Sequence, residues 1–316
     1  MEKVKLGSCG VEVSRLCFGS LTMAPQQANM PPEKGAELLL HAFSRGVNYI
    51  DTAQLYDNYS HIRLALKKWN GGDIVLQSKT YAYNRALAVE AVEQARRALD
   101  RDVIDIFMLH EQESIHTLRG HAEALEQLFE YKARGVIRAV GVSMHHVAAA
   151  EGVCRHGDID VIHPMLNVEG AGIVDGGRED MERAIKKAHC LGIGVVSMKP
   201  FGGGALFRRA DECLDYLLSL DYVDAVAIGM QTIEEIDANI DFFEKGAFDA
   251  AALGKIRARE RRLMIMDWCE ACGDCVRACK NGAMSIDSGA ARVDPSKCVL
   301  CGYCAARCKN ACIKVV

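Results

Sequence analysis

The sequence lacks any apolar run approaching the roughly 20 residues that span a bilayer, and its first residues lack the apolar stretch of a secretory signal. It also lacks an excess of basic charge, because 38 lysines and arginines face 42 aspartates and glutamates and give a formal net charge of −4. A chain without a positive field does not hold nucleic acid by counterion release. We therefore expect a cytoplasmic protein with no membrane partner and no nucleic-acid partner.

Neither a G-x-G-x-x-G motif nor a P-loop occurs, which excludes the ordinary dinucleotide and triphosphate folds. Cysteine, by contrast, is abundant: nine of the 14 cysteines fall between Cys269 and Cys312, and the other five are scattered. In a cytoplasmic chain, where thiols stay reduced, cysteines massed at short spacings indicate a metal site rather than disulfides. The cysteines thus divide the chain into two parts.

Residues 1 to about 248 alternate short β-branched runs with longer amphipathic ones. The strand-like runs are 16–19, 48–51, 74–79, 104–110, 137–143, 161–163, 195–199 and 226–229. The helix-like stretches include 32–45, 87–99, 122–134, 178–190 and 233–243. Eight such pairs predict an α/β fold, a closed (β/α)8 TIM barrel, with its chemistry at the C-terminal ends of the strands. Residues 4–13 are typical of a hairpin that plugs the opposite end.

The pattern predicts three segments: the barrel over residues 1–248, a helical connector over 249–266 and a cysteine-rich tail over 267–316. The connector is basic from Lys255 to Arg262, which is more typical of a solvated helix face than of a docking surface for an acidic partner. Since no low-complexity linker separates the segments, we expect them to pack together.

The tail carries the run C-x2-C-x2-C-x3-C twice, 29 residues apart. Two C-x2-C pairs also make zinc knuckles, but the third and fourth cysteines of each run are surplus to a zinc ribbon, so the spacing favours iron–sulfur clusters. The tail resembles a bacterial-type two-cluster ferredoxin domain. The resemblance implies one 4Fe-4S cluster on Cys269, Cys272, Cys275 and Cys308 and a second on Cys298, Cys301, Cys304 and Cys279. Lys280 and Lys309 replace the proline that usually follows the fourth cysteine, and their charges favour reduced clusters.

The segment from Gly46 to Tyr56 resembles the second strand of the aldo-keto reductases, in which an aspartate stands five residues before a tyrosine. The resemblance continues along the later strand-like runs and covers nearly all of residues 4–243. It implies the family's catalytic tetrad, which in this sequence is Asp51, Tyr56, Lys79 and His110. A strand-terminal aspartate is often a helix cap and a strand-terminal histidine is often core, but four such residues at successive strand mouths favour catalysis.

In the chemistry that this resemblance implies, Tyr56 is the general acid that protonates a substrate oxygen as hydride reaches the carbon. Lys79 lowers the pKa of the Tyr56 phenol by stabilising phenolate, and Asp51 keeps the lysine protonated. His110 orients the substrate carbonyl against the Tyr56 hydroxyl.

The nucleotide contacts of the family are only partly kept. The resemblance assigns Ser143, His163 and Met198 to the nicotinamide side and Asn239 to the adenine side. Met144 stands where an asparagine is usual, His163 replaces a glutamine, and Met198 replaces a stacking aromatic residue. These changes weaken nicotinamide binding without abolishing it.

The basic residue that would hold a 2′-phosphate falls near Met230 or Gln231, so selectivity for NADP is poorly supported. Gly203, one of three consecutive glycines, offers backbone to a phosphate or belongs to a flexible loop. Lys199 replaces a small polar residue; it points either toward the barrel mouth, where it would bind an anionic substrate or cofactor phosphate, or into a helix face.

Three functions follow from these patterns. The first is an oxidoreductase that reduces a carbonyl or a related polarised group, with the clusters relaying electrons. A hydride carries two electrons, whereas each cluster carries one. The second hypothesis is therefore a one-electron reductase that receives its electrons from a flavin or a ferredoxin and uses no nicotinamide. The third is a non-catalytic, redox-sensing barrel. The expected cofactors are two 4Fe-4S clusters with NADPH, NADH or a flavin, and the expected partners are a small-molecule substrate and an electron-transfer protein.

Overall fold

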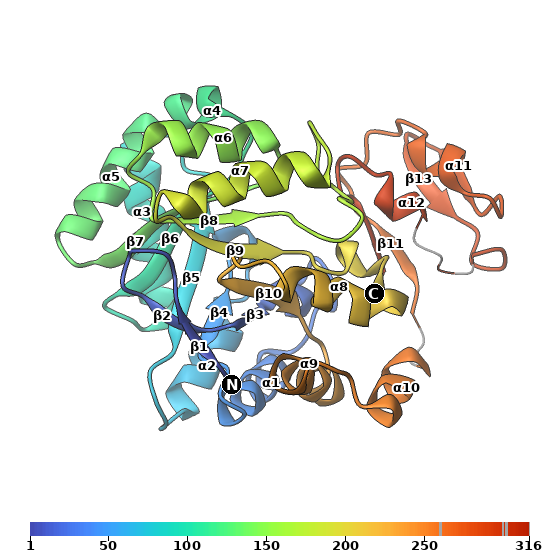
Figure 1. Cartoon of the computed structure of the whole chain (residues 1–316), viewed down its shortest axis with the longest axis horizontal. Helices are drawn as coiled ribbons and strands as arrows, with labels where there is room; N and C mark the ends of the chain where they lie inside the picture. The colour runs from blue at the N-terminus through green and yellow to red at the C-terminus, as the bar shows by residue number, and fades with distance from the viewer. Residues whose placement is uncertain (259–260, 299, 301–302, 316) are drawn as a thin grey trace.

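Figure 1 shows a computed structural model of the chain, which describes residues 1–258, 261–298, 300 and 303–315. Cys301, one of the eight cysteines assigned to the clusters, lies outside the described residues. No helix in the described ranges is long and apolar enough to cross a membrane.

Eight parallel strands close into a barrel, as the sequence predicts. They are β3 (Leu16–Gly19), β4 (Tyr49–Asp51), β5 (Val75–Thr80), β6 (Ile104–Gln112), β7 (Ile137–Met144), β8 (Val161–Pro164), β9 (Gly194–Met198) and β10 (Ala225–Gly229). The barrel closes where β10 pairs with β3. Every predicted strand is found within one or two residues of its expected bounds, because each is a buried apolar run of the length that a barrel strand needs.

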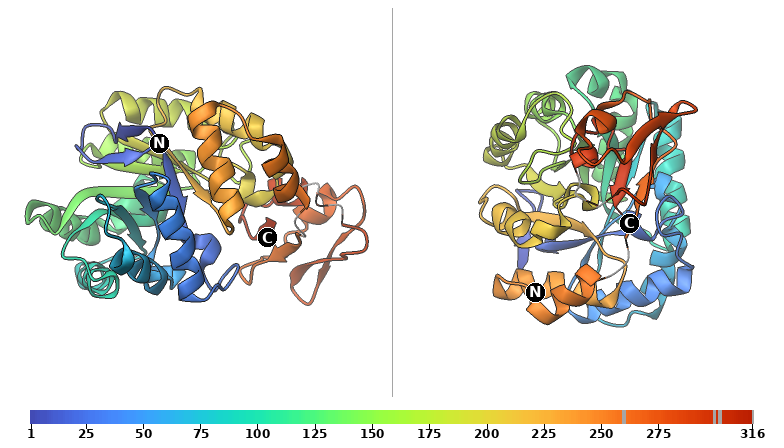
Figure 2. Two further views of the ribbon diagram at one scale, coloured as in Figure 1. Left: turned by 90° about the horizontal axis from the view of Figure 1, so that it is seen from below. Right: turned by 90° about the vertical axis from the view of Figure 1, so that its right-hand side faces the viewer.

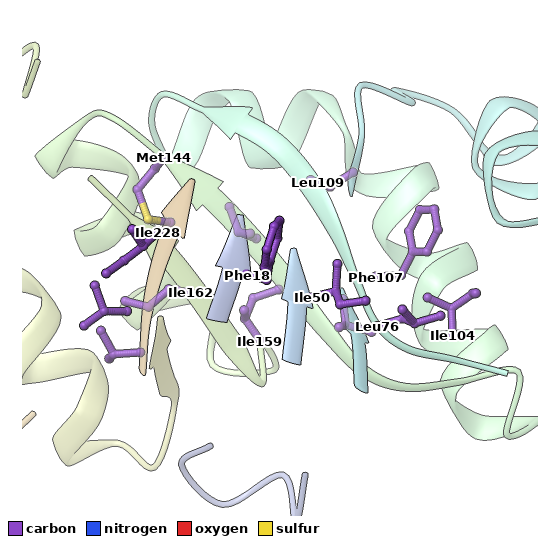
Figure 3. Close-up of a cluster of buried hydrophobic side chains, with 14 of the residues drawn as sticks. Phe18, Ile50, Leu76, Ile104, Phe107, Leu109, Met144, Ile159, Ile162 and Ile228 are labelled. Carbon is purple, nitrogen blue, oxygen red and sulfur yellow. The ribbon is translucent and has the colours of Figure 1, made fainter. Parts of the chain in front are cut away.

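The side chains of each strand alternate between two cores. Phe18 and Ile50 face outward, into the layer between the strands and the surrounding helices, where Figure 3 shows them with other large apolar side chains. Cys17 and Tyr49 face inward, into the closed interior. Residues two positions apart share a face, so Asp51 follows Tyr49 into the interior at the C-terminal end of its strand.

The N-terminal end of the barrel is closed by a hairpin of β1 (Lys3–Lys5) and β2 (Glu12–Ser14), as expected. Leu6, Val11 and Val13 of this segment are fully buried in the interior core. Gly7 fits here only without a side chain, since a Cβ would lie 2.3 Å from the carbonyl oxygen of Gly192. With one end plugged, the C-terminal end is the one left for ligands.

Helices surround the barrel. They are α1 (Pro32–Ser44), α2 (Tyr59–Lys68), α3 (Arg85–Leu99), α4 (Ile115–Gly120), α5 (Ala122–Ala133), α6 (Val147–His156), α7 (Arg178–Cys190), α8 (Ala210–Leu218), α9 (Ile233–Lys245) and α10 (Ala250–Ala258). Short 3-10 turns are η1 (Ser20–Met23), η2 (Gln54–Tyr56), η3 (Gly202–Gly204) and η4 (Phe207–Arg209). The five helices expected from the sequence are present, and α2, α4, α6 and α8 add to them.

The connector differs from the expected helix. Among its described residues only α10 is helical, and Leu263–Ile265 form strand β11, because this stretch pairs antiparallel with the last strand, β14 (Ile313–Val315). The tail between them contains α11 (Asp274–Ala278), a hairpin of β12 (Met284–Asp287) and β13 (Ala290–Val293), and α12 (Tyr303–Ala306).

The tail packs against the barrel, as expected from the missing linker. Figures 1 and 2 show it beside one end of the barrel, and β14 contacts the η3 turn that follows β9. The contact is close: a Cβ on Gly204 would lie 2.7 Å from the carbonyl oxygen of Val315. The tail therefore lies at the C-terminal ends of the strands.

Candidate functional site

A buried ion pair occupies the inner mouth of the barrel. Lys79 Nζ lies 2.6 Å from Asp51 Oδ1 and also donates to the carbonyl oxygen of Thr52 at 2.9 Å. Gln77 Nε2 donates to the same carboxylate at 2.6 Å. Burial alone would raise the pKa of Asp51, but the charges of Lys79 and His163 hold it well below its usual range. The aspartate is therefore ionised and fixes the lysine.

Tyr56 lies in the η2 turn directly after β4, partly buried, with its hydroxyl 3.5 Å from Lys79 Nζ. Removal of the phenol from water raises its pKa well above 10, and the carboxylates of Asp51 and Glu111 raise it further. This differs from the expectation that Lys79 lowers the pKa of Tyr56, because burial and the two carboxylates determine the direction of the shift. The hydroxyl is consequently protonated at neutral pH, which is the form that a proton donor needs.

His110 completes the group of four. It is 5% exposed and contacts the edge of Tyr56, with ring centroids 5.8 Å apart, while its other face stacks on Tyr81 at 4.5 Å. Burial and the nearby Lys79 charge lower the pKa of His110 well below 6.5, so the ring is neutral. Its Nδ1 makes no hydrogen bond to any described residue. The structure thus brings all four residues of the expected tetrad together.

A cavity of about 240 Å³ opens beside this group. It runs from Asp51 and Tyr56, past Met198 at the end of β9, to Gln231 before α9 and Asn239 in the middle of that helix. Its far wall comes from the connector and the tail, which supply residues such as Arg261, Lys314 and Val315. The cavity is therefore shared between the barrel and the segments that follow it.

The residues expected to bind a nucleotide fall into two groups. His163, Met198, Lys199, Gly203 and Asn239 line the cavity. His163 is held by a 2.7 Å hydrogen bond between its Nδ1 and the carbonyl oxygen of Val196, and Asn239 Oδ1 has no hydrogen-bond partner within the described ranges.

Ser143 stands apart from that set. Its hydroxyl is fully buried and accepts a hydrogen bond from the Glu111 backbone at 2.8 Å, so it holds the end of β6.

Several cavity residues escaped the sequence analysis because they come from outside the barrel pattern. Arg261 of the connector lies over the Phe207 ring and 3.5 Å from Glu235. Lys314 of β14 is 7% exposed. Next to them, His145 accepts a 2.8 Å hydrogen bond from Lys199 Nζ. Lys314 and His145 gave no sequence signal beyond their own polar side chains, and Arg261 belongs to the basic run from Lys255 to Arg262 that was interpreted as a solvated helix face.

The tail gathers cysteines around a small core. Cys275, Cys304, Cys308 and Cys312 are buried there, and Cys269 and Cys279 pack against them. Backbone amides of Ala291 and Ala283 donate to Cys269 Sγ and Cys279 Sγ at 3.3 and 3.2 Å. Backbone hydrogen bonds lower the pKa of Cys269, whereas burial raises the pKa of Cys275 and the neighbouring Cys308 raises it further.

Cys312 lies among these thiols although it is outside the repeated run. Its Sγ is 3.2 Å from Cys308 Sγ, and its backbone amide donates to the same sulfur at 3.4 Å. Over the described part of the chain, no three His, Cys, Asp or Glu side chains are arranged to hold a metal ion.

The closed barrel and the four polar residues at its mouth define a class of β/α barrel protein. The chain belongs to the aldo/keto reductase family, whose model matches residues 15–213. The matched residues end before the cysteine-rich tail.

Individual relatives are distant. The chain is 31% identical over 157 residues to the uncharacterized oxidoreductase YqkF of Bacillus subtilis, covering 45% of this chain and 49% of that protein. It is 26% identical over 183 residues to the aldo-keto reductase YhdN of the same organism, covering 53% and 54%. The chain thus matches about half the length of these relatives. The structure of aldo-keto reductase AKR11C1 from Bacillus halodurans is similar with a TM-score of 0.66 and 24% identity, over 81% of this chain and 95% of that one, which supports the fold.

Proposed function

We propose that the protein is an oxidoreductase that reduces a carbonyl or a related polarised group, with Tyr56 as the proton donor and iron–sulfur clusters in the tail as an electron relay. The observation that carries this proposal is the contact chain from Asp51 through Lys79 to the Tyr56 hydroxyl, over distances of 2.6 and 3.5 Å. The last residue of this series of contacts, Tyr56, lines the cavity, where a substrate oxygen can reach its hydroxyl.

The residues of the site have separate roles in this reaction. As the C=O π bond breaks, the carbon gains a hydride and the oxygen gains the proton of the Tyr56 hydroxyl, so two electrons and two hydrogens enter the product. The neutral ring of His110 lies at the edge of the tyrosine and orients the carbonyl. Lys79 stabilises the phenolate that Tyr56 leaves behind, and Asp51 keeps that ammonium charged.

The cavity fits a nicotinamide dinucleotide in part. His163 and Met198 line its inner end, and the unpaired Asn239 Oδ1 offers an acceptor at its outer end. When bound there, such a dinucleotide supplies the hydride. At the outer end Glu235 is paired with Arg261 at 3.5 Å, and Gln231 stands near the place of the basic residue that would hold a 2′-phosphate. We therefore expect weak nucleotide binding without a preference for NADPH.

The donor set of the tail fits iron–sulfur clusters. Thiolates are the usual ligands of such clusters, and amides that donate to sulfur, as at Cys269 and Cys279, stabilise the charged form. Cys269 and Cys308 lie close enough to Cys275 in the same small core to help raise the pKa of its thiol, which supports the proposal that these three share one cluster. Each cluster supplies or accepts one electron, so reduction of the carbonyl through the clusters would take one electron from each of the two, together with two protons, in place of a hydride.

The test uses protein purified without air. Iron and sulfide analysis is expected to give about eight of each per chain. Reduction of a panel of aldehydes is followed with NADH, NADPH and reduced ferredoxin as donors. Tyr56→Phe removes one hydroxyl and is expected to lower turnover at least about 100-fold with an unchanged cluster spectrum.

Tyr83→Phe is the matched control, because it removes the same hydroxyl group from a tyrosine that is 59% exposed and lies outside the cavity. Full activity of Tyr56→Phe would contradict the proposed proton donor. Zinc with little iron would contradict the clusters. Tight, phosphate-selective binding of NADPH, measured by nucleotide fluorescence, would contradict the weak site.

A further inference from the structure

Two lysines from different parts of the chain meet at the wall of the cavity. Lys199 follows β9 at the barrel mouth, and Lys314 is the central residue of β14 in the tail. Both line the cavity and a smaller hollow beside it. The chain holds them together through the η3 turn, since the Lys314 side chain lies 3.6 Å from the position of a Cβ on Gly203.

The positive charge of this pair is poorly balanced. The Lys314 side chain is 7% exposed, and no hydrogen bond or ion pair joins its ammonium to another described residue. Within the same part of the chain, the Lys199 ammonium donates only to His145, a neutral ring, at 2.8 Å. Glu111 is the nearby carboxylate, and it is shared with His145 at 3.7 Å and with the Tyr81 hydroxyl. A buried ammonium without a partner is costly, so such a group commonly marks a ligand site.

The backbone at Lys199 supports the same conclusion. Its φ is +57°, in the left-handed region that a residue with a side chain rarely enters. The carbonyl oxygen of Lys199 accepts a 3.4 Å hydrogen bond from Asn167 Nδ2, which helps to hold this conformation. Strained residues of this kind concentrate at ligand sites, where they aim a side chain that regular structure would turn away.

We propose that Lys199 and Lys314 form an anion-binding subsite that takes a carboxylate or phosphate group of a ligand in the barrel cavity, with the tail supplying half of it. The inference rests on the proposed function in one respect, which is that the ligand lies beside Tyr56. The group comes either from the substrate, which is then an anionic carbonyl compound, or from the pyrophosphate of a dinucleotide. Two ammonium groups match the negative charge and the hydrogen-bond-accepting oxygens of either source.

Binding, rather than turnover, tests this subsite, so that failure of catalysis leaves the test intact. The probes are 4-carboxybenzaldehyde, its neutral methyl ester, inorganic pyrophosphate, NADH and NADPH. Calorimetry follows the first three and nucleotide fluorescence the last two. The variants are Lys199→Met and Lys314→Met in the full chain purified without air. Lys297→Met is the matched control, because Lys297 belongs to the same tail but is exposed and pairs with Asp294.

Each subsite variant is expected to weaken at least one anionic probe by about tenfold to 100-fold, the usual effect of losing a charge-assisted contact, while the ester and the control remain unchanged. Loss confined to the carboxylate assigns the subsite to the substrate. Equal losses for pyrophosphate, NADH and NADPH assign it to the dinucleotide. The inference is overturned if every anionic probe binds Lys199→Met or Lys314→Met as tightly as it binds the unsubstituted protein. It is also overturned if binding of the methyl ester weakens equally in these variants, or if Lys297→Met weakens anion binding to the same extent. Circular dichroism and iron content check that each variant is folded.

Discussion

The buried pair of Asp51 and Lys79 yields a prediction about stability that is independent of any ligand. At a separation of 2.6 Å and an effective dielectric constant of about 20, the attraction between the two charges is roughly 6 kcal/mol. The free-energy cost of removing both groups from water offsets part of this attraction. Lys79 is 1% exposed, so its replacement leaves the carboxylate without its main partner. Lys79→Met is therefore expected to cost about 3 kcal/mol, the lower end of the range for broken buried pairs, because Gln77 and His163 still face Asp51.

The measurement is a double-mutant cycle by equilibrium urea unfolding, followed by circular dichroism. Asp51→Asn combined with Lys79→Met removes both charges at once, so we expect it to cost about 2 kcal/mol less than the sum of the single variants. The control is Lys34→Met, which breaks an exposed pair with Glu37 and is expected to change stability by about 0.5 kcal/mol or less. Additive single effects, within about 0.5 kcal/mol, would refute the reasoning.

Two further predictions concern pH and the tail. Burial lowers the pKa of His110 and of His145 well below 6.5, so below about pH 6.5 the unfolded chain takes up protons that the native chain does not. The free energy of unfolding is therefore highest above the pKa of these histidines in the unfolded chain. It falls as the pH drops below about 6.5, by up to about 1.4 kcal/mol per pH unit for each histidine. A midpoint of urea unfolding that does not change between pH 7 and pH 5 would contradict this prediction. Cys279→Ser is expected to remove the signal of the second cluster in electron paramagnetic resonance, whereas the exposed Cys190→Ser leaves both. Loss of the first cluster alone would reverse the ligand assignment.

The sequence predicted those parts of the molecule that depend on short-range patterns. The barrel strands are apolar runs bounded by turns, and their period of two places Asp51, Lys79 and His110 on the inner face without further information. The helices α2, α4, α6 and α8 were not among the stretches named from the sequence. α4 is only six residues long, which is too short for a recognisable apolar period. α2 does carry an apolar face, with Tyr59, Ile62 and Ala65 spaced three residues apart, and this period was missed.

Contacts between distant parts of the chain could not be predicted in the same way. Leu263–Ile265 form a strand because β14, about 50 residues later, pairs with them. The pKa of Tyr56 depends on its burial and on the nearby carboxylates of Asp51 and Glu111, which only the fold brings around it. Likewise, a lysine two residues after the last cysteine gives no local sign that it will line a cavity in the barrel.

The position of β14 links the state of the cysteine core to the state of the cavity. Cys312 packs on Cys308 within that core, and two residues later Lys314 and Val315 form cavity wall. If the clusters order the tail, as metal ions order other small cysteine-rich units, the cavity wall is complete only in the loaded protein. A cysteine variant then loses both an electron carrier and part of the binding site. Lys314→Met removes only the second, so comparing the two kinds of variant separates electron transfer from binding.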